Sequence, residues 1–415
     1  MRLMHSAGRF GALFSVCLLL SCGADNTTPA DQTSQPSVSA NDPLCATPGT
    51  DINWPALASS RCQRLSDYRL FIGKPDNPEN LSESSGGIHY QLNSELFSDH
   101  ARKQRYLFIP DNQKAIFDAN EVFQFPQGTV LVKVFSLPTV STAHPDSEIM
   151  EVRLLIHRTH GWVFIPYVWN PSIQDAELAI AGSRQSVSFS HQYQSQQYQS
   201  TQYQLQQNQS LQALAQQPLA QEQQLNFNYE SPSQLACESC HRKDTDTGVV
   251  FSPIGPKARH LNRNIIIDGQ AVNQLEYWQQ RGIISLPDRP LPFAPDWRDT
   301  TYPLQQRAKA YLDINCAHCH SDQGAAALSG LRLEYGREVG YLHGVCNSAH
   351  GWRGGGYDIW PGLGSESSIP LRMELNEAKD RMPPIGRQVS DDEAVDLIRE
   401  WIDSLPYQEC AAVSN

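Results

Sequence analysis

Two short motifs constrain this chain more than any other feature, because each has the spacing C-x-x-C-H. They are Cys237-Glu238-Ser239-Cys240-His241 and Cys316-Ala317-His318-Cys319-His320. Two thiols at this spacing can reach the two vinyl groups of one haem, and the histidine that follows is placed beneath the iron as its proximal ligand. The motifs therefore predict two covalently bound c-type haems, with attachment through Cys237, Cys240, Cys316 and Cys319 and with His241 and His320 on the irons.

Two other uses of paired cysteines are less favoured. Two C-x-x-C pairs can form a Cys₄ zinc site, but these pairs lie much farther apart in the sequence than in a usual zinc ribbon. A dithiol redox motif needs no histidine after its second cysteine, whereas both motifs have one. The histidines thus favour haem over zinc or a redox dithiol.

The distal ligand of the second iron is predicted from Met382-Pro383-Pro384, which follows the second motif. The prolines hold this segment extended and rigid, so that the Met382 sulfur can be aimed at the iron. Met373 is the rival ligand, although a methionine in a core needs no further role. Ligation by a thioether raises the reduction potential relative to a second histidine.

The first iron has no comparable partner in the sequence. His260 is the only histidine between the two motifs. It is either a surface residue or the sixth ligand of the first haem. If it is a surface residue, the first iron is five-coordinate or takes Met150 or another distant residue.

The first residues of the chain resemble an export signal. Arg2 and Arg9 precede an apolar stretch at 10–20, so residues 1–21 are predicted to be a secretory signal peptide. Cys22 directly follows that stretch, as the lipidated cysteine does in bacterial lipoproteins. Residues 22–44 are polar and predict a flexible tether. We expect a lipoprotein of the bacterial cell envelope that faces the periplasm, on the outer membrane, and is held by its lipid alone.

Charge and the remaining cysteines narrow the partners and the covalent links. The net charge is −12, so nucleic acid is not an expected partner, and the expected partner is an exported redox protein of unknown identity. Four cysteines lie outside the motifs, the signal peptide and the lipid site, and an even number in an exported chain predicts disulfides. Of the three possible pairings, we prefer Cys45–Cys62 with Cys346–Cys410.

Residues 45–230 predict a β-rich domain. Apolar runs at 103–110, 128–137, 151–158 and 163–169 are typical of strands, and Thr159-His160-Gly161 indicates a hairpin turn. We expect a β-sandwich core without a site of its own. Residues 191–224 contain 16 glutamines in 34 positions, which predicts a disordered insertion.

Helical patterns dominate the end of the chain. Residues 302–314 have an apolar face, and Ser390 and Glu393 form a predicted capping box before a second apolar face that ends near Leu405 and Pro406. We therefore predict a multidomain fold: a β-rich N-terminal domain followed by two mainly α-helical cytochrome c-type haem domains, at 231–300 and 301–410.

The chain also resembles a bacterial family of di-haem c-type cytochromes that are often encoded beside a parallel β-helix protein. The resemblance covers both C-x-x-C-H motifs and most of the mature chain apart from the Gln-rich segment. It is carried by 92–99, 123–129, 167–170, 273–275, 372–373 and 382–384. The C-terminal part is similar to class I cytochrome c, a small helical fold around one haem. The resemblance implies the same six haem-attachment residues and Met382 as a distal ligand, but no substrate.

The haems make electron transfer outside the cytoplasm the expected function. An alternative is a peroxidase-like di-haem redox enzyme, in which an open first iron performs catalysis. A third possibility is a binding or assembly protein whose β-rich domain docks a partner. The spin state of each haem separates the first two, because an open iron is high-spin.

Overall fold

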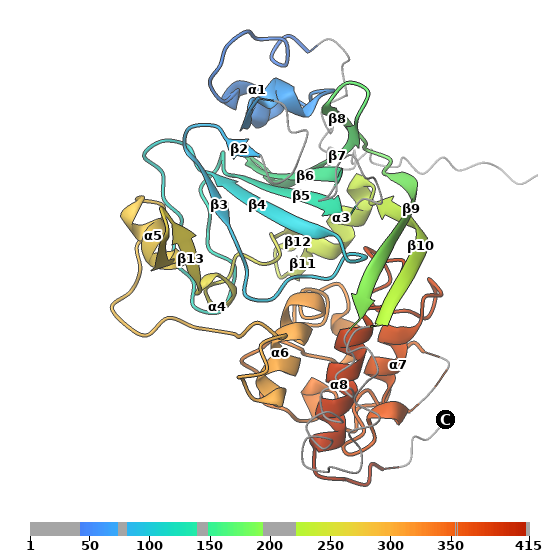
Figure 1. The fold of residues 1–415 in the computed structure, drawn as a ribbon. Coiled ribbons are helices and arrows are strands. Elements are labelled where there is room, and N and C mark those ends of the chain that lie inside the picture. Colours follow the sequence, from blue (N-terminus) through green and yellow to red (C-terminus); the bar gives the residue numbers. More distant parts are fainter. Residues whose placement is uncertain are drawn as a thin grey trace, which may run out of the picture. The chain divides into compact units, whose positions relative to one another are not determined.

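A six-stranded antiparallel sheet forms the centre of the fold. The computed structural model describes residues 42–73, 81–138, 148–193, 221–352, 354 and 356–411. The strand order follows the sequence, so each strand pairs with the next along the chain (Figure 1). The strands are β3 (Gly87–Tyr90), β4 (Arg102–Phe108), β5 (Val130–Leu137), β6 (Glu148–Arg158), β7 (Gly161–Asn170) and β8 (Asp175–Leu178). The strands predicted from the apolar runs are confirmed.

The two faces of this sheet are covered by different parts of the chain. Side chains alternate along each strand, so Tyr106 and Val132 belong to one core cluster while Leu107 and Leu131 belong to another. The strands form one sheet, so the predicted β-sandwich is wrong. No second sheet of comparable size packs against it among the described residues. Instead, the segment that precedes the sheet in the sequence covers one face, and a segment that follows it covers the other.

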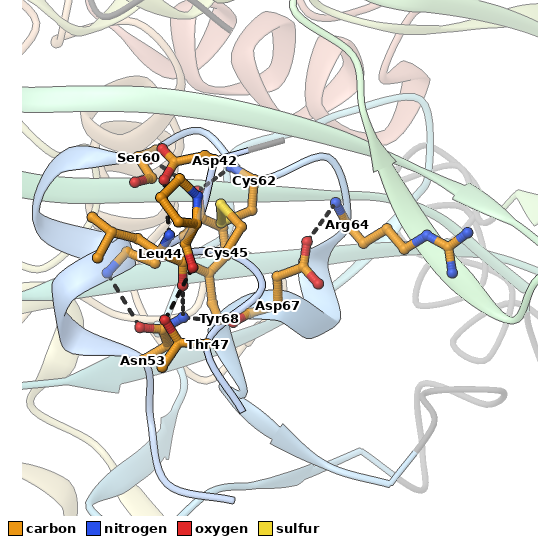
Figure 2. Close-up of a disulfide and its surroundings, with 12 residues drawn as sticks. Asp42, Leu44, Cys45, Thr47, Asn53, Ser60, Cys62, Arg64, Asp67 and Tyr68 are labelled. Carbon is orange, nitrogen blue, oxygen red and sulfur yellow. Dashed lines mark hydrogen bonds between the residues drawn. A yellow bond between two sulfur atoms is a disulfide. The ribbon is translucent and has the colours of Figure 1, made fainter. Parts of the chain in front are cut away.

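The N-terminal segment packs on the first face. It consists of α1 (Trp54–Ser59), the 3₁₀ helix η1 (Leu65–Tyr68) and the short pair β1 (Phe71–Ile72) and β2 (Ser82–Glu83). Asn53 begins α1 by accepting the Ala56 N–H, and its amide donates to the Leu44 carbonyl at 2.7 Å. Cys45 and Cys62 form the predicted disulfide beside it, with a sulfur–sulfur distance of 2.00 Å (Figure 2).

Residues 234–280 cover the second face of the sheet. Short helices alternate here with two small hairpins: α3 (Gln234–His241), β11 (Arg242–Thr245), β12 (Gly248–Phe251), α4 (Ala258–Leu261), β13 (Asn264–Ile267), β14 (Gln270–Asn273) and α5 (Gln274–Gln280). Asp268 and Gly269 both have positive φ, 50° and 77°, as a type I′ hairpin turn requires. Leu261, Leu275 and Trp278 from this segment join the core beneath the sheet.

Three helices and long irregular segments form the C-terminal part. The helices are α6 (Leu304–Asn315), α7 (Ser368–Glu374) and α8 (Asp392–Ser404), with the 3₁₀ turns η4 (Ala327–Ser329), η5 (Tyr341–His343) and η6 (Gly364–Glu366) between them. The buried face of α8 contains Ile398 and Trp401, as predicted. The predicted capping box is wrong, because α8 begins after Asp391 and Ser390 instead donates to the Asp392 carboxylate. The second predicted disulfide, Cys346–Cys410, is confirmed at 1.99 Å.

A long hairpin connects the sheet region with the C-terminal helices (Figure 1). Strands β9 (Ser183–Tyr193) and β10 (Gln221–Ser231) pair along their whole length. Both ends of the predicted Gln-rich insertion therefore belong to strands. The middle of the insertion, residues 194–220, lies outside the described residues. Gln388, just before α8, donates to Glu230 of β10.

The predicted fold class is wrong. Strands make up 29% and helices 22% of the structure, so the chain does not end in two mainly α-helical cytochrome domains. The segment around the first motif alternates short strands and helices, because its β-branched runs are interrupted by turn residues every few positions. Around the second motif, long stretches between the helices form no regular structure.

Several predictions concern the N-terminus. The signal peptide, Cys22 and the tether up to residue 41 lie outside the described residues. Within the described ranges, no helix is long and apolar enough to cross a membrane. The described residues all belong to one compact unit. The domain boundaries at 231 and 301 stay a prediction.

Candidate functional site

The first C-x-x-C-H motif lies on helix α3. Ser233 caps this helix by accepting the Ala236 N–H, and Cys237 and Cys240 lie one turn apart on it. The ring of His241 approaches the Ser252 carbonyl with its Nδ1 at 2.8 Å. A carbonyl oxygen can only accept, so Nδ1 carries the proton. The His241 Nε2 is therefore left with its lone pair, as an iron ligand requires.

The second motif follows helix α6 and has the same arrangement at its histidine. The N–H groups of Cys319 and His320 both donate to the Cys316 carbonyl, which folds the motif into one turn. The His320 Nδ1 lies 2.9 Å from the Ser329 hydroxyl. Ser329 donates its own proton to the Ala326 carbonyl at 2.7 Å, so it accepts from His320. Again Nε2 retains its lone pair.

The four motif cysteines are free thiols. Burial raises the pKa of Cys240 and Cys316 to about 12 and that of Cys319 to about 11. A reactive dithiol needs the opposite shift, because the thiolate is the nucleophile. Among the described residues, no group of three or more His, Cys, Asp or Glu side chains is arranged to hold a metal ion.

A cavity opens beside the first motif, between the motif and the second face of the sheet. Leu155 and Phe164 of the sheet, Ile254 and Ile314 give it an apolar wall. Pro383, Ile385 and Gly386 from the loop after Met382 also line it. An apolar wall next to two thiols and an available imidazole nitrogen is the kind of lining that the apolar ring of a haem would require.

Three basic side chains lie on one side of this cavity. Arg105, Lys133 and Arg153 stand directly opposite one another on β4, β5 and β6, and all three line the cavity. Arg105 pairs with Glu95 at 2.7 Å and Arg153 pairs with Glu151. Lys133 has no such partner among the described residues, and burial, followed by the charges of Arg105 and Arg153, lowers its pKa to about 7.

A row of like charges directly across strands destabilises a sheet unless anions neutralise it, and Glu95 and Glu151 do so for the two arginines but not for Lys133. The two propionates of a haem are carboxylates at one edge of an apolar ring. The cationic row and the apolar wall therefore match both ends of a haem. Lys133, Arg105 and Arg153 are the residues that would hold its propionates.

The second motif lies against the first. His318, between the two cysteines of the second motif, lines the same cavity as Cys237 and His241. Cys319 contributes, after burial, to the raised pKa of Cys240. Burial and then His320 lower the pKa of His318 to about 4, so that its ring is neutral.

One of the two expectations for His260 was that it is a surface residue, and this is wrong. It is 1% exposed, and its Nε2 lies 2.7 Å from the Asp313 carboxylate. Arg259 donates to both oxygens of the same carboxylate, at 2.7 and 2.8 Å. Burial alone would raise the pKa of Asp313, but His260 and Arg259 hold it well below its usual range. This network joins α4 to α6.

The two candidate methionine ligands of the second iron have different surroundings. Met373 is 5% exposed in the core formed with α8, as a methionine without a further role would be. Met382 is half-buried in the loop after α7, where its N–H donates to the Arg372 carbonyl at 2.9 Å. The Arg387 guanidinium binds the carbonyls of Met382, Met373 and Leu375, which fixes this loop to α7.

The structure thus brings together residues that sequence reasoning named with residues that it missed. His318 was visible as a histidine inside a motif, but only the fold shows that it faces the other motif. The cationic row had no signal in the sequence, because three residues on three strands become neighbours only in the correct register. No known family, no curated protein and no solved structure matches this chain.

Proposed function

We propose that this protein is a di-haem c-type cytochrome that transfers electrons outside the cytoplasm. The observation that carries the proposal is the state of the two C-x-x-C-H motifs. Both hold free thiols, and both fix the histidine Nδ1 proton so that Nε2 can bind iron. A bound haem supplies an iron that alternates between the ferric and ferrous states.

The surroundings of the motifs support electron transfer between two haems. Cys240 and His241 share a second cavity wall with Ala317 and His318, so the first haem would lie beside the second motif. On the second iron, Met382 is the proposed distal ligand, and a thioether favours the ferrous state. The second haem would then accept electrons from the first. An exported protein of unknown identity would be the redox partner, and a lipid on Cys22 would hold the protein at the periplasmic side of the outer membrane.

A di-haem redox enzyme is the alternative function. The observation that favours it is the polar wall near His241, where Lys257, His260 and Asp313 line the cavity. Such groups can move protons during catalysis. This function requires an open position on the first iron, which the resting spin state reveals.

The test is the covalent haem content of protein matured in a bacterial periplasm. Mass spectrometry under denaturing conditions should find two haem additions per chain. Replacing Cys316 and Cys319 by alanine should leave one addition, and replacing Cys237 and Cys240 as well should leave none. Wild-type protein without covalent haem, or with a single haem, would contradict the proposal.

A further inference from the structure

We propose that His318 is the distal axial ligand of the first haem, so that the second motif completes the coordination of the iron held by the first. This inference rests on the proposed function. It names the sixth ligand that the sequence left open between His260, Met150 and an empty position.

The position of His318 is the first argument. Its side chain lines the apolar cavity that also contains Cys237, Cys240 and His241. It lines the neighbouring polar cavity with Cys240 and His241 as well.

The state of its ring is the second argument. The His318 Nδ1 is buried and makes no hydrogen bond of good geometry among the described residues, although the Ile314 carbonyl lies close to the ring. A buried imidazole nitrogen without a partner needs an explanation, since buried polar groups are almost always satisfied. Iron bound at Nδ1 would give this nitrogen its partner.

The other candidate ligands are occupied elsewhere. The His260 Nε2 is taken by Asp313 at 2.7 Å, and although its Nδ1 is also buried without a partner among the described residues, the ring lines the polar cavity and not the apolar one. Met150 packs with Phe135, Phe189 and Tyr229 in a separate core cluster. Met373 packs in the C-terminal core. None of these three side chains lines the apolar cavity of the first motif, whereas His318 does.

The consequence for electron transfer would be a continuous bonded path between the two haems. His318 immediately precedes Cys319, which would carry the thioether of the second haem. The first iron would then be joined to the second macrocycle through one imidazole, a short stretch of backbone and one sulfur. Two histidines on the first iron and histidine with methionine on the second also give the second haem the higher potential.

The experiment compares His318→Ala with wild-type protein and with His260→Ala, all first shown by mass spectrometry to contain two covalent haems. In the wild type, near-infrared magnetic circular dichroism and electron paramagnetic resonance of the oxidised protein should show one low-spin bis-histidine haem and one histidine–methionine haem. His318→Ala should convert the first to a high-spin, CO-binding haem. Added imidazole should restore the low-spin signal. His260→Ala should keep the wild-type spectrum.

A second substitution covers the case in which the cavity fails to form around alanine. His318→Met should replace the bis-histidine signature by a second histidine–methionine signature and raise the lower of the two potentials. The inference is overturned if the wild type contains two haems and the first is high-spin. It is also overturned if both His318 variants retain the bis-histidine signature, or if His260→Ala removes it. A wild type without haem would instead contradict the proposed function.

Discussion

Asp313 is the residue whose loss should reveal how the two motif regions are held together. Its carboxylate accepts hydrogen bonds from Arg259 Nε and Nη2, from His260 Nε2 and from the Tyr335 N–H, at distances between 2.7 and 3.0 Å. The Asp313 side chain is 1% exposed and that of Arg259 is 9% exposed. Asp313→Asn would leave the Arg259 guanidinium buried without its counter-charge.

The expected cost follows from this burial. Removing one partner of a buried ion pair costs about 3–5 kcal/mol, because the remaining charge stays desolvated. Asp322 is the matched control: it pairs with Arg332 and Arg337, but its side chain is 70% exposed. Asp322→Asn should cost at most about 1 kcal/mol, because solvent screens such pairs.

The assay is thermal unfolding of the two variants at pH 7, monitored by circular dichroism on samples with equal haem content. Asp313→Asn should lower the midpoint by roughly 5–15 °C, and Asp322→Asn by a few degrees at most. Equal small shifts in both variants would refute the reasoning, because they would mean that the Arg259–Asp313 pair is no better shielded than a surface pair.

Four further predictions concern the ligand, the lipid, the insertion and pH. Met382→His should lower the higher of the two haem potentials and remove the methionine–iron charge-transfer band, whereas a band that survives would point to Met373. Cys22→Ala should release the protein from membranes or leave it unprocessed, and unchanged fractionation would contradict the lipid anchor. Deleting 194–220 and closing the hairpin with a two-residue turn should leave haem content and thermal midpoint unchanged, because β9 and β10 pair along their whole length; a large loss of either would show that the segment is structural. Burial raises the pKa of Asp99 to about 6, so its carboxyl binds a proton more tightly in the folded state than in the unfolded state. As the pH rises from 4 to 6, the contribution of Asp99 to the free energy of unfolding should therefore fall by roughly 2–3 kcal/mol. Asp99→Asn should reduce this dependence in denaturant titrations, and an unchanged slope would exclude Asp99 as its source.

Local patterns predicted the local elements of this fold well. The apolar run at 128–137 became β5, and the turn at Thr159-His160 joined β6 to β7. The apolar face of α8 was also correct, since its spacing fits only a helix packed on one side. Counting the cysteines outside the motifs, the signal peptide and the lipid site predicted disulfides, and their positions in the sequence favoured, among three possible pairings, the one that forms.

The predicted helical haem domains failed because the motifs were given more weight than the residues around them. Ile265-Ile266-Ile267 followed by Asp268-Gly269 is a strong hairpin signal, and it became β13, β14 and the turn between them. The sheet was expected to have no site, because Lys133 and Arg153 look like ordinary polar residues of a strand. Their inward direction and cross-strand pairing depend on register, which a single sequence does not specify.

The cavity of the first motif also determines when it can be completed during synthesis. Its walls come from β4 to β7, from α3, from the end of α6 and from the loop at 383–387. On the proposed export route, Cys237 and Cys240 would emerge well before the last of these walls exists. Haem-attaching enzymes would therefore meet an open and largely unfolded segment, and the later part of the chain would close over a haem already in place. A chain truncated before Pro383 should still be able to receive its first haem, but would leave one side of the ring in water.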